Sequence, residues 1–397
     1  MKHAGTTTRP TKNSNGYLPT LDGWRAIAVA MVCVSHTRPF PGYLSKLNKL
    51  RDFGDSGVNL FFAISGILIC SRLLEEEKIT GRISLIGFYI RRAFRILPAA
   101  YLFLAIIALM ALSHITPHDW HGWWAAVLLY RNYLGAAVGD TNTNRLTGHF
   151  WSLSIEEHFY LLLPFLLVAL PRYRKLALGL LLTLSLAWLG LYLGTTPPAM
   201  RQLIWIRRTD LRIWCLILPA LLALFLQNPR LRAWFVRYLY PSTAFAPFIL
   251  YVCFHFAHKF YFHIPSIPPP PFDPHSVAVP ITTFDPINGL IAPLLMPFLI
   301  LSTMLHPEAW LSQFLEWQPM RAIGRVSYGI YLWQQIYFNS SYYPDWPLGR
   351  VPQILLAGLV ILCILSSYFL VEKPLIRLGH RLAPPVTPGH LDLQSSK

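Results

Sequence analysis

Two ionisable residues, Arg25 and His36, lie within one apolar segment near the N-terminus, LDGWRAIAVAMVCVSH. Ionisable side chains inside a membrane span are costly, and they usually face a protein interior or a water-filled cavity. Eleven steps of about 100° along a helix bring His36 to within roughly 20° of the direction of Arg25. We therefore predict that both side chains face one cavity. The alternative is that Arg25 extends to a lipid headgroup while His36 lies at the opposite interface.

A second ionisable cluster occurs in the segment HFWSLSIEEHFYLLLPF, where Glu156 and Glu157 are adjacent. Adjacent helical positions point about 100° apart, so one carboxylate can face a cavity while the other meets a different partner. Glu156 and Tyr160 are spaced i,i+4 and are predicted to share a helical face. For Glu157 the alternative to a functional role is a structural ion pair, with Arg212 or another buried arginine.

Three arginines, Arg91, Arg92 and Arg95, stand just before an apolar run in FYIRRAFRILPAAY. Spacings of i,i+3 and i,i+4 let Arg91 or Arg92 share a helical face with Arg95. Guanidinium groups present rigid forks that suit phosphate, so the cluster indicates an anion site. The alternative is that these arginines only mark the cytoplasmic end of a span.

The elements that must position these residues are predicted to be membrane helices. The chain has 397 residues, of which 54% are hydrophobic and 13% are charged. Several continuous apolar stretches reach the roughly 20 residues that cross a bilayer as a helix, and they do not alternate as barrel strands do. The short apolar segment 122–135 is predicted to be re-entrant or interfacial. We predict an all-α polytopic membrane protein with about ten spans, at 20–37, 57–74, 96–113, 150–170, 175–194, 210–226, 240–258, 286–305, 325–339 and 352–371.

Charge sets the expected orientation. Most of the 34 Lys and Arg residues fall on the side of the N-terminus, which the positive-inside rule assigns to the cytoplasm together with the C-terminus. This loop bias explains the net charge of +16 without nucleic-acid binding. We predict one membrane domain, 20–380, between cytoplasmic tails 1–19 and 381–397, with the Pro-rich segment 259–285 as an outer loop. The polar N-terminus lacks a cleavage signal, so the first span is expected to be retained.

Six stretches, in order along the chain, resemble the acyltransferase-3 family of membrane acyltransferases, in the short form without a fused extracytoplasmic hydrolase-like domain. The resemblance implies a ten-helix fold in the bacterial inner membrane. It also implies transfer of an acyl group, commonly acetyl, from cytosolic acyl-CoA to a hydroxyl of a glycan or other acceptor at the outer face. The stretches are LDGWRAIAVAMVCVSH, GVNLFFAISGILI at 57–69, FYIRRAFRILPAAY at 88–101, WSLSIEEHFYLLLP at 151–164, GRVSYGIYLW at 324–333 and FLVEKPLIRLGHRL at 369–382.

The resemblance also implies roles for single residues. Arg25 and His36 correspond to the pair on the catalytic helix, and Arg92 and Arg95 to an Arg-x-x-Arg pair near the donor. Glu156 matches the functional acid of the WSL motif.

Acyl transfer suggests how these groups would act. A neutral imidazole suits the removal of a proton from an attacking alcohol, so His36 is predicted to be the general base. Glu156 is expected to orient the imidazole, as a carboxylate does in catalytic triads. Arg25 would hold the donor or stabilise the oxyanion, and the three-arginine cluster would bind the nucleotide end of CoA. Prior acylation of Ser35 is a disfavoured alternative, because adjacent residues point to different faces of a helix.

One departure from the family pattern is visible. The family often has Ser-Tyr-x-x-Tyr-Leu-x-His, whereas this chain has Ser327, Tyr328, Tyr331 and Leu332 followed by Gln334. Glutamine forms hydrogen bonds but does not exchange a proton near neutrality. An acid or base role at this position is therefore not expected here.

Two other classes of protein stay open at this point. A proton-coupled transporter or flippase of a glycan or lipid-linked substrate would also bury Arg, Glu and His residues, and a membrane sensor would show no turnover. The five cysteines all fall in apolar segments without metal-ligand spacing, so no metal is predicted. The expected partners are acyl-CoA, commonly acetyl-CoA, a hydroxyl acceptor and the lipid bilayer, with a homo-oligomer left open.

Overall fold

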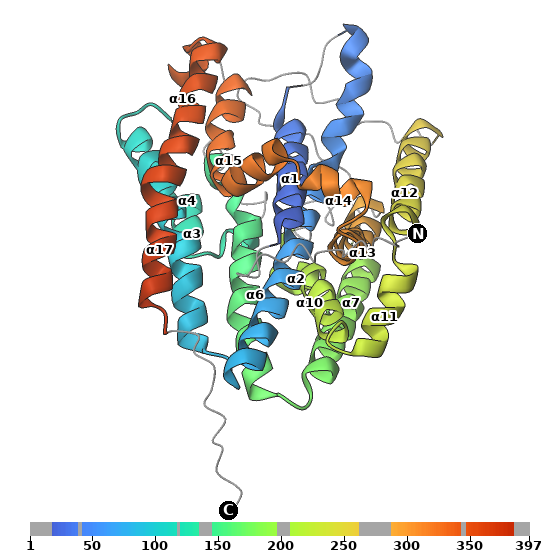
Figure 1. Cartoon of the computed structure of the whole chain (residues 1–397). Helices are drawn as coiled ribbons and strands as arrows, with labels where there is room; N and C mark the ends of the chain where they lie inside the picture. The colour runs from blue at the N-terminus through green and yellow to red at the C-terminus, as the bar shows by residue number, and fades with distance from the viewer. Residues whose placement is uncertain are drawn as a thin grey trace, which may run out of the picture.

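The protein is a bundle of helices with no β-strand among the residues described in this computed structural model, which are 18–38, 42–116, 120–134, 145–196, 207–261, 287–342 and 347–384 (Figure 1). The predicted all-α fold is confirmed. The α-helices are α1 (Pro19–His36), α2 (Gly54–Thr80), α3 (Leu85–Leu112), α4 (Trp120–Val127), α5 (Arg145–Gly148), α6 (Phe150–Ala169), α7 (Arg174–Thr195), α9 (Thr209–Arg212), α10 (Trp214–Phe225), α11 (Pro229–Tyr238), α12 (Pro241–Tyr261), α13 (Ala292–Leu305), α14 (Trp310–Leu315), α15 (Gln318–Tyr342), α16 (Gln353–Ser366) and α17 (Lys373–Leu382). The 3-10 helices are η1 (Gly42–Phe53), η2 (Arg131–Tyr133) and η4 (Pro347–Arg350), and the π-helices are η3 (Ile287–Ile291) and η5 (Ser367–Glu372).

Five helical stretches in the described part of the chain are long and apolar enough to cross a membrane. They are Leu50–Thr80, Leu85–Leu112, Leu146–Ala169, Arg174–Thr195 and Gln353–Leu382. The helices α10 and α11, which are bent by 109° at their junction, would make a sixth if they form one span. The protein is thus a multi-pass helical membrane protein, and the predicted count of ten spans is not confirmed.

The helices that fall short of this test do so for identifiable reasons. α1 carries Asp22, Arg25 and His36, and the C-terminal half of α15 carries buried amide side chains, so both are too polar for a lipid-facing span. Their polar groups face other helices instead, as expected for ionisable residues at membrane depth. The apolar parts of α12 and α13 are shorter than a full span.

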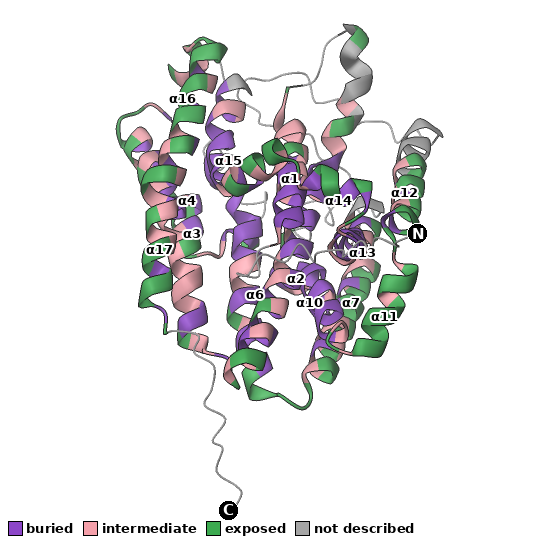
Figure 2. Cartoon of the chain, in the orientation of Figure 1, coloured by how far each residue is buried: buried purple, intermediate pink, exposed green. Residues whose placement is uncertain are grey.

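The pair α1 and α15 forms the centre of the bundle, and α2 packs on α1 (Figures 1 and 2). Glycines allow this close approach, because a Cβ atom at Gly324 of α15 would overlap the backbone carbonyl of Asp22. A Cβ atom at Gly57 of α2 would lie 2.6 Å from the carbonyl oxygen of Ala28. Small residues commonly let membrane helices pack at backbone distance. The result is that Arg25 is held beside both α2 and α15.

Helix α3 begins earlier than predicted. It starts at Leu85, after Ser84, whose hydroxyl oxygen accepts a hydrogen bond of 3.1 Å from the backbone N–H of Gly87. The predicted span began at residue 96 because the arginines were assigned to a preceding loop. The three arginines lie inside the helix instead. Their helical spacing therefore determines which of them share a face.

The segment 122–135 is broken into the eight-residue helix α4 and the short turn η2. A helix of that length rises about 12 Å, well short of a bilayer core. Arg131 and Asn132 are buried in the turn. The expectation that this segment does not span a membrane as one helix agrees with its structure.

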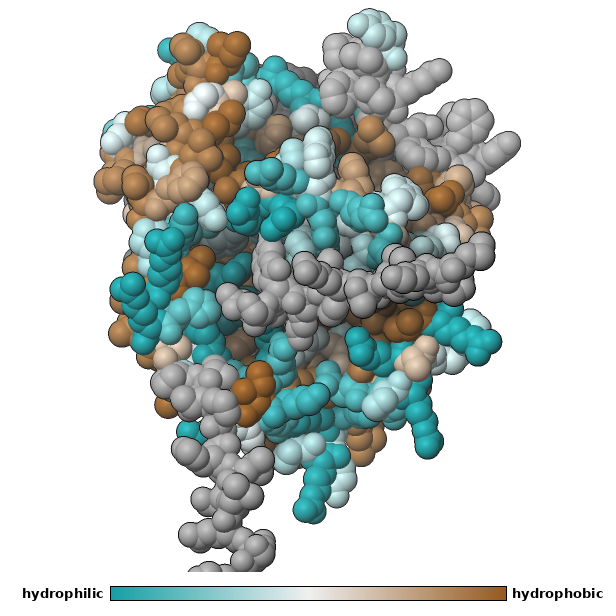
Figure 3. All heavy atoms as spheres, viewed as in Figure 1, coloured by the Kyte–Doolittle hydropathy of each residue, from teal (hydrophilic) through white to brown (hydrophobic). Residues whose placement is uncertain are grey.

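The periphery of the bundle is apolar where it would meet lipid. Figure 3 shows hydrophobic side chains gathered at the upper left, over α16, and hydrophilic ones toward the middle and lower end. Ile354 and Leu355 of α16 and Leu370 of η5 are largely exposed. Most of the predicted tails 1–19 and 381–397, and most of the Pro-rich segment 259–285, lie outside the described residues.

Candidate active site

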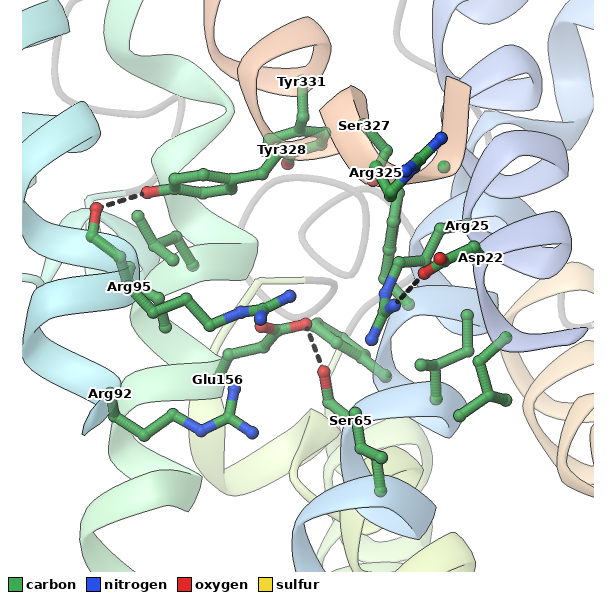
Figure 4. Close-up of a pocket in the computed structure, with 18 of the residues that line it drawn as sticks. Asp22, Arg25, Ser65, Arg92, Arg95, Glu156, Arg325, Ser327, Tyr328 and Tyr331 are labelled. Carbon is green, nitrogen blue, oxygen red and sulfur yellow. Dashed lines mark hydrogen bonds and ion pairs between the residues drawn. The ribbon is translucent and has the colours of Figure 1, made fainter. Parts of the chain in front are cut away.

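A cavity of about 350 Å³ opens between α1, α2, α3, α6, α15, η5 and α17 (Figure 4). Its volume falls in the range typical of small-molecule sites, roughly 300–1,000 Å³. Five arginines and three carboxylates line it, so positive charge is in excess. These side chains are Arg25, Arg72, Arg92, Arg95, Arg325, Asp22, Glu156 and Glu372.

Arg92 and Arg95 enter the cavity from one face of α3, as their i,i+3 spacing predicts. Arg95 is exposed although it lies within the bundle, because it points into the open cavity (Figure 4). The Arg92 guanidinium lies 5.0 Å from the centre of the Tyr160 ring. Among the described residues, neither arginine has a carboxylate within ion-pair distance. Both guanidinium groups are therefore available to an anionic ligand.

Arg91 belongs to a different environment. Its guanidinium donates to the Glu76 carboxylate at 2.8 Å, and it does not line the cavity. The prediction of a three-arginine cluster at one site is therefore wrong for Arg91. One step along a helix turns a side chain by about 100°, which is enough to remove Arg91 from the face shared by its neighbours.

Glu156 is anchored at the floor of the cavity. Its carboxylate accepts hydrogen bonds from the Ser65 hydroxyl at 3.2 Å and from the Tyr160 hydroxyl at 2.8 Å. The predicted shared face of Glu156 and Tyr160 is confirmed. Arg92 and Arg25 lie close enough to interact electrostatically with this carboxylate.

The structural alternative for Glu157 was an ion pair with Arg212, and the structure does not show this pair. Arg212 donates to the Asn59 side chain at 2.9 Å and stacks on the Trp151 ring, 5.4 Å from its centre. The Oε1 atom of Glu157 is buried without a hydrogen-bond partner, and Arg92 is the arginine that influences this carboxylate electrostatically. Among the described residues, Glu157 therefore forms no ion pair with an arginine.

Arg25 also lines the cavity, held by Asp22 one turn earlier on α1. The Arg25 Nη1 atom lies 2.7 Å from the Asp22 Oδ1 atom. This ion pair fixes the direction of the Arg25 side chain (Figure 4). The Asp22 carboxylate also offsets part of the repulsion between the positive charges of Arg25 and Arg95. Asp22 was missed by sequence reasoning, although its i,i+3 spacing from Arg25 is a recognisable signal.

His36 does not line this cavity, so the predicted common cavity for Arg25 and His36 is wrong. Their directions agree around the helix, but eleven residues also separate them by about 16 Å along its axis. His36 lies at the other end of α1, where its ring stacks near Phe338 with centroids 6.2 Å apart. No hydrogen bond joins His36 to Glu156 among the described residues, since Glu156 is bonded to Ser65 and Tyr160.

Helix α15 connects the cavity with His36. Tyr331 lines the cavity, and its hydroxyl lies 2.6 Å from the Ser152 hydroxyl. Gln335, one turn further along α15, lies 3.1 Å from the imidazole of His36. Gln334, at the position of the family histidine, bonds instead to the backbone oxygen of Tyr331 at 3.3 Å. The sequence drew attention to Gln334, but the residue that contacts His36 is its neighbour.

Nearly all of the residues that line the cavity belong to a stretch that matches a known protein family. The model of the acyltransferase-3 family, described as an acyltransferase domain, matches residues 18–372. The chain belongs to this family. The resemblance found in the six sequence stretches is thereby confirmed.

Three relatives among those found carry names that describe acyl transfer. One from Staphylococcus aureus (strain COL), provisionally named an O-acetyltransferase, is 28% identical over 91% of this chain and 58% of its own length. YrhL of Bacillus subtilis (strain 168), provisionally named a peptidoglycan O-acetyltransferase, is 29% identical over 92% of this chain and 56% of its own. The peptidoglycan O-acetyltransferase OatA of Listeria monocytogenes is 28% identical over 82% of this chain and 50% of its own. The acyltransferase-3 chain thus spans between half and three fifths of these relatives, and no solved structure matches it.

Within the described residues, no group of three His, Cys, Asp or Glu side chains gathers as a metal site would require.

Proposed function

We propose that this acyltransferase-3 protein is an integral membrane O-acyltransferase that moves an acyl group, acetyl in the simplest case, from cytosolic acyl-CoA to a hydroxyl of a glycan. The observation that carries the proposal is the cationic cavity, into which Arg92 and Arg95 extend without carboxylate partners among the described residues. Guanidinium forks of this kind suit the phosphates of CoA. The names of the relatives favour a peptidoglycan-like acceptor.

Within this proposal Arg92 and Arg95 bind the nucleotide end of acyl-CoA, and Arg91 supports α3 through Glu76. Arg25, held by Asp22, binds the donor or stabilises the oxyanion that forms on the thioester carbonyl. Because His36 lies beyond Tyr331, the acylated arm of the donor must reach past this tyrosine to meet the base.

The chemical step needs one base. The Nε2 atom of His36 takes the proton of the acceptor hydroxyl while the hydroxyl oxygen attacks the thioester carbonyl carbon. A carbon–oxygen bond forms, the carbon–sulfur bond breaks, and the CoA thiolate leaves and takes up the proton from the imidazolium. Glu156, which does not contact His36, serves in this scheme as the negative charge that keeps the arginines of the cavity in place.

The proposal includes the predicted topology, with ten spans, both termini in the cytoplasm and a bacterial inner membrane as location. The domain is taken as residues 20–380, with tails 1–19 and 381–397. This orientation places the α2–α3 connection inside and the α1–α2 connection outside, so that the donor enters from the cytosol and the acceptor from the other face.

A proton-coupled transporter or flippase is not supported by the family to which the chain belongs. The decisive experiment is to give acetyl-CoA to the purified protein in detergent, where no gradient exists, and to compare the O-acetyl groups on the glycans of cells with and without the protein. An acyltransferase releases CoA thiol and leaves O-acetyl groups that disappear with the gene. Absence of both effects would contradict the proposal.

A further inference from the structure

The hydrogen bonds of His36 define which of its nitrogens carries the proton. The Nδ1 atom lies 2.8 Å from the backbone oxygen of Val32. A carbonyl oxygen only accepts hydrogen bonds, so Nδ1 is the protonated nitrogen. In the neutral ring, Nε2 therefore carries the lone pair that would take a proton from an acceptor.

That lone pair already has a partner. The amide nitrogen of Gln335 lies 3.1 Å from Nε2 of His36, and only an amide N–H can donate to an unprotonated ring nitrogen. The carbonyl oxygen of Gln335 accepts in turn from the Asn339 amide at 2.8 Å. Both amide side chains are buried. The orientation of the Gln335 amide is thus fixed from both ends.

We propose that Gln335 is a positioning residue that caps the lone pair of His36 at rest and is displaced by the hydroxyl of the acceptor. This inference rests on the proposed function, in which His36 is the base. The cap has a consequence for selectivity between acceptors. A glycan brings further contacts that offset the loss of the Gln335 hydrogen bond, whereas a lone water molecule brings almost none.

The reaction that the cap opposes is hydrolysis of the donor. Water would give one proton to Nε2 of His36, its oxygen would form the new bond to the thioester carbon, and the carbon–sulfur bond would break. The products are the free carboxylic acid and CoA thiol. A base that already accepts a hydrogen bond from Gln335 is a poor partner for this water molecule.

The test compares two neighbouring glutamines in the full-length protein. Gln335→Met keeps the length of the side chain and removes its donor. Gln334→Met is the matched control, because Gln334 is also buried but bonds to the backbone of Tyr331 and not to His36. Hydrolysis is measured as thiol release from acetyl-CoA by detergent-purified protein without acceptor, and transfer as O-acetyl content of the glycans of cells that carry each variant.

The expected signature is a change in the ratio of the two reactions. A net hydrogen bond is worth roughly 0.5–1.5 kcal/mol, so Gln335→Met should raise hydrolysis about 2- to 10-fold without a matching rise in transfer. Gln334→Met should leave the ratio unchanged. Gln335→Glu should abolish both reactions, because a carboxylate only accepts and would draw a proton onto Nε2.

Two results would overturn the proposal that Gln335 caps the lone pair of His36. In one, Gln335→Met lowers hydrolysis and transfer by the same factor, as loss of packing would; in the other, it changes neither. Binding of acetyl-CoA, measured for each variant, shows that the donor cavity is still folded. A failure of the proposed function looks different, since His36→Ala would then transfer acetyl groups as the parent does, and the proposal about Gln335 would fall with it.

Discussion

The sharpest prediction concerns Arg95 and Arg91, two arginines on the same helix in opposite situations. Arg95 points into the cavity without a carboxylate partner among the described residues, whereas Arg91 is bound to Glu76 at 2.8 Å. Replacement of Arg95 by alanine should therefore weaken the binding of acyl-CoA. Replacement of Arg91 by alanine should weaken the fold.

The magnitudes follow from these contacts. A hydrogen bond between charged groups contributes about 1.5–3 kcal/mol, so Arg95→Ala should raise the Kd for acetyl-CoA about 10- to 100-fold. Arg95 lies among like charges from Arg25 and Arg92, so its removal should leave the thermal midpoint unchanged or slightly higher. Arg91→Ala removes the ion-pair partner of the buried Glu76, which keeps only the hydrogen bond from the backbone N–H of Ser84. This change should cost about 1–3 kcal/mol of stability.

The assay is the binding of labelled acetyl-CoA to each detergent-purified variant, with thermal unfolding recorded on the same samples. The two variants should separate completely, one losing affinity and the other losing stability. If Arg91→Ala weakens binding as strongly as Arg95→Ala, or if neither does, the arginine cavity is not the donor site.

Three further predictions test other parts of the site. Glu156→Gln should tighten acetyl-CoA binding, because it removes a negative charge from the cavity. It should also reduce turnover, because glutamine keeps only one of the two oxygens that accept hydrogen bonds from the Ser65 and Tyr160 hydroxyls. Weaker binding would contradict this prediction. Gly324→Ala should destabilise the protein by more than about 1 kcal/mol because its Cβ meets the backbone of α1, while Gly358→Ala, which has open space around it, should be neutral or stabilising in the same unfolding measurement. A membrane-impermeant thiol reagent applied to intact cells should label a cysteine that replaces Tyr43, which is 90% exposed, but not one that replaces the exposed Arg82. The parent protein gives the background labelling. The reverse pattern would invert the topology.

Sequence reasoning succeeded where helical periodicity alone decides the outcome. The i,i+3 pair Arg92 and Arg95 and the i,i+4 pair Glu156 and Tyr160 lie on shared faces as predicted. The family was also recognisable from its six stretches, because these are ordered along most of the chain.

Sequence reasoning failed where the neighbours of a residue depend on its position along the helix axis or on packing between distant segments. Arg25 and His36 point in similar directions around α1, yet their axial separation places only Arg25 in the cavity. The contact of Gln335 with His36 joins residues that are 299 positions apart, and no local pattern reports it. The count of ten spans is not confirmed for a related reason, since α1 and α15 are polar helices whose partners are other helices.

The position of Arg91 illustrates a third limit. Its ion pair with Glu76 spans 15 positions across the α2–α3 connection, and it became visible only once α3 was seen to begin at Leu85. The Arg91 side chain therefore turns toward α2, away from the face that Arg92 and Arg95 share.

The central claim is that His36 is the base for acyl transfer from a donor bound at the arginine cavity. The most direct measurement compares the parent protein with His36→Ala, recording both the Kd for labelled acetyl-CoA and the rate of labelled acetyl transfer to cell-wall glycan. Because His36 lies outside the cavity, we expect an unchanged Kd and a rate reduced by about 10² to 10⁴. Transfer at the parental rate by folded His36→Ala protein would contradict the account.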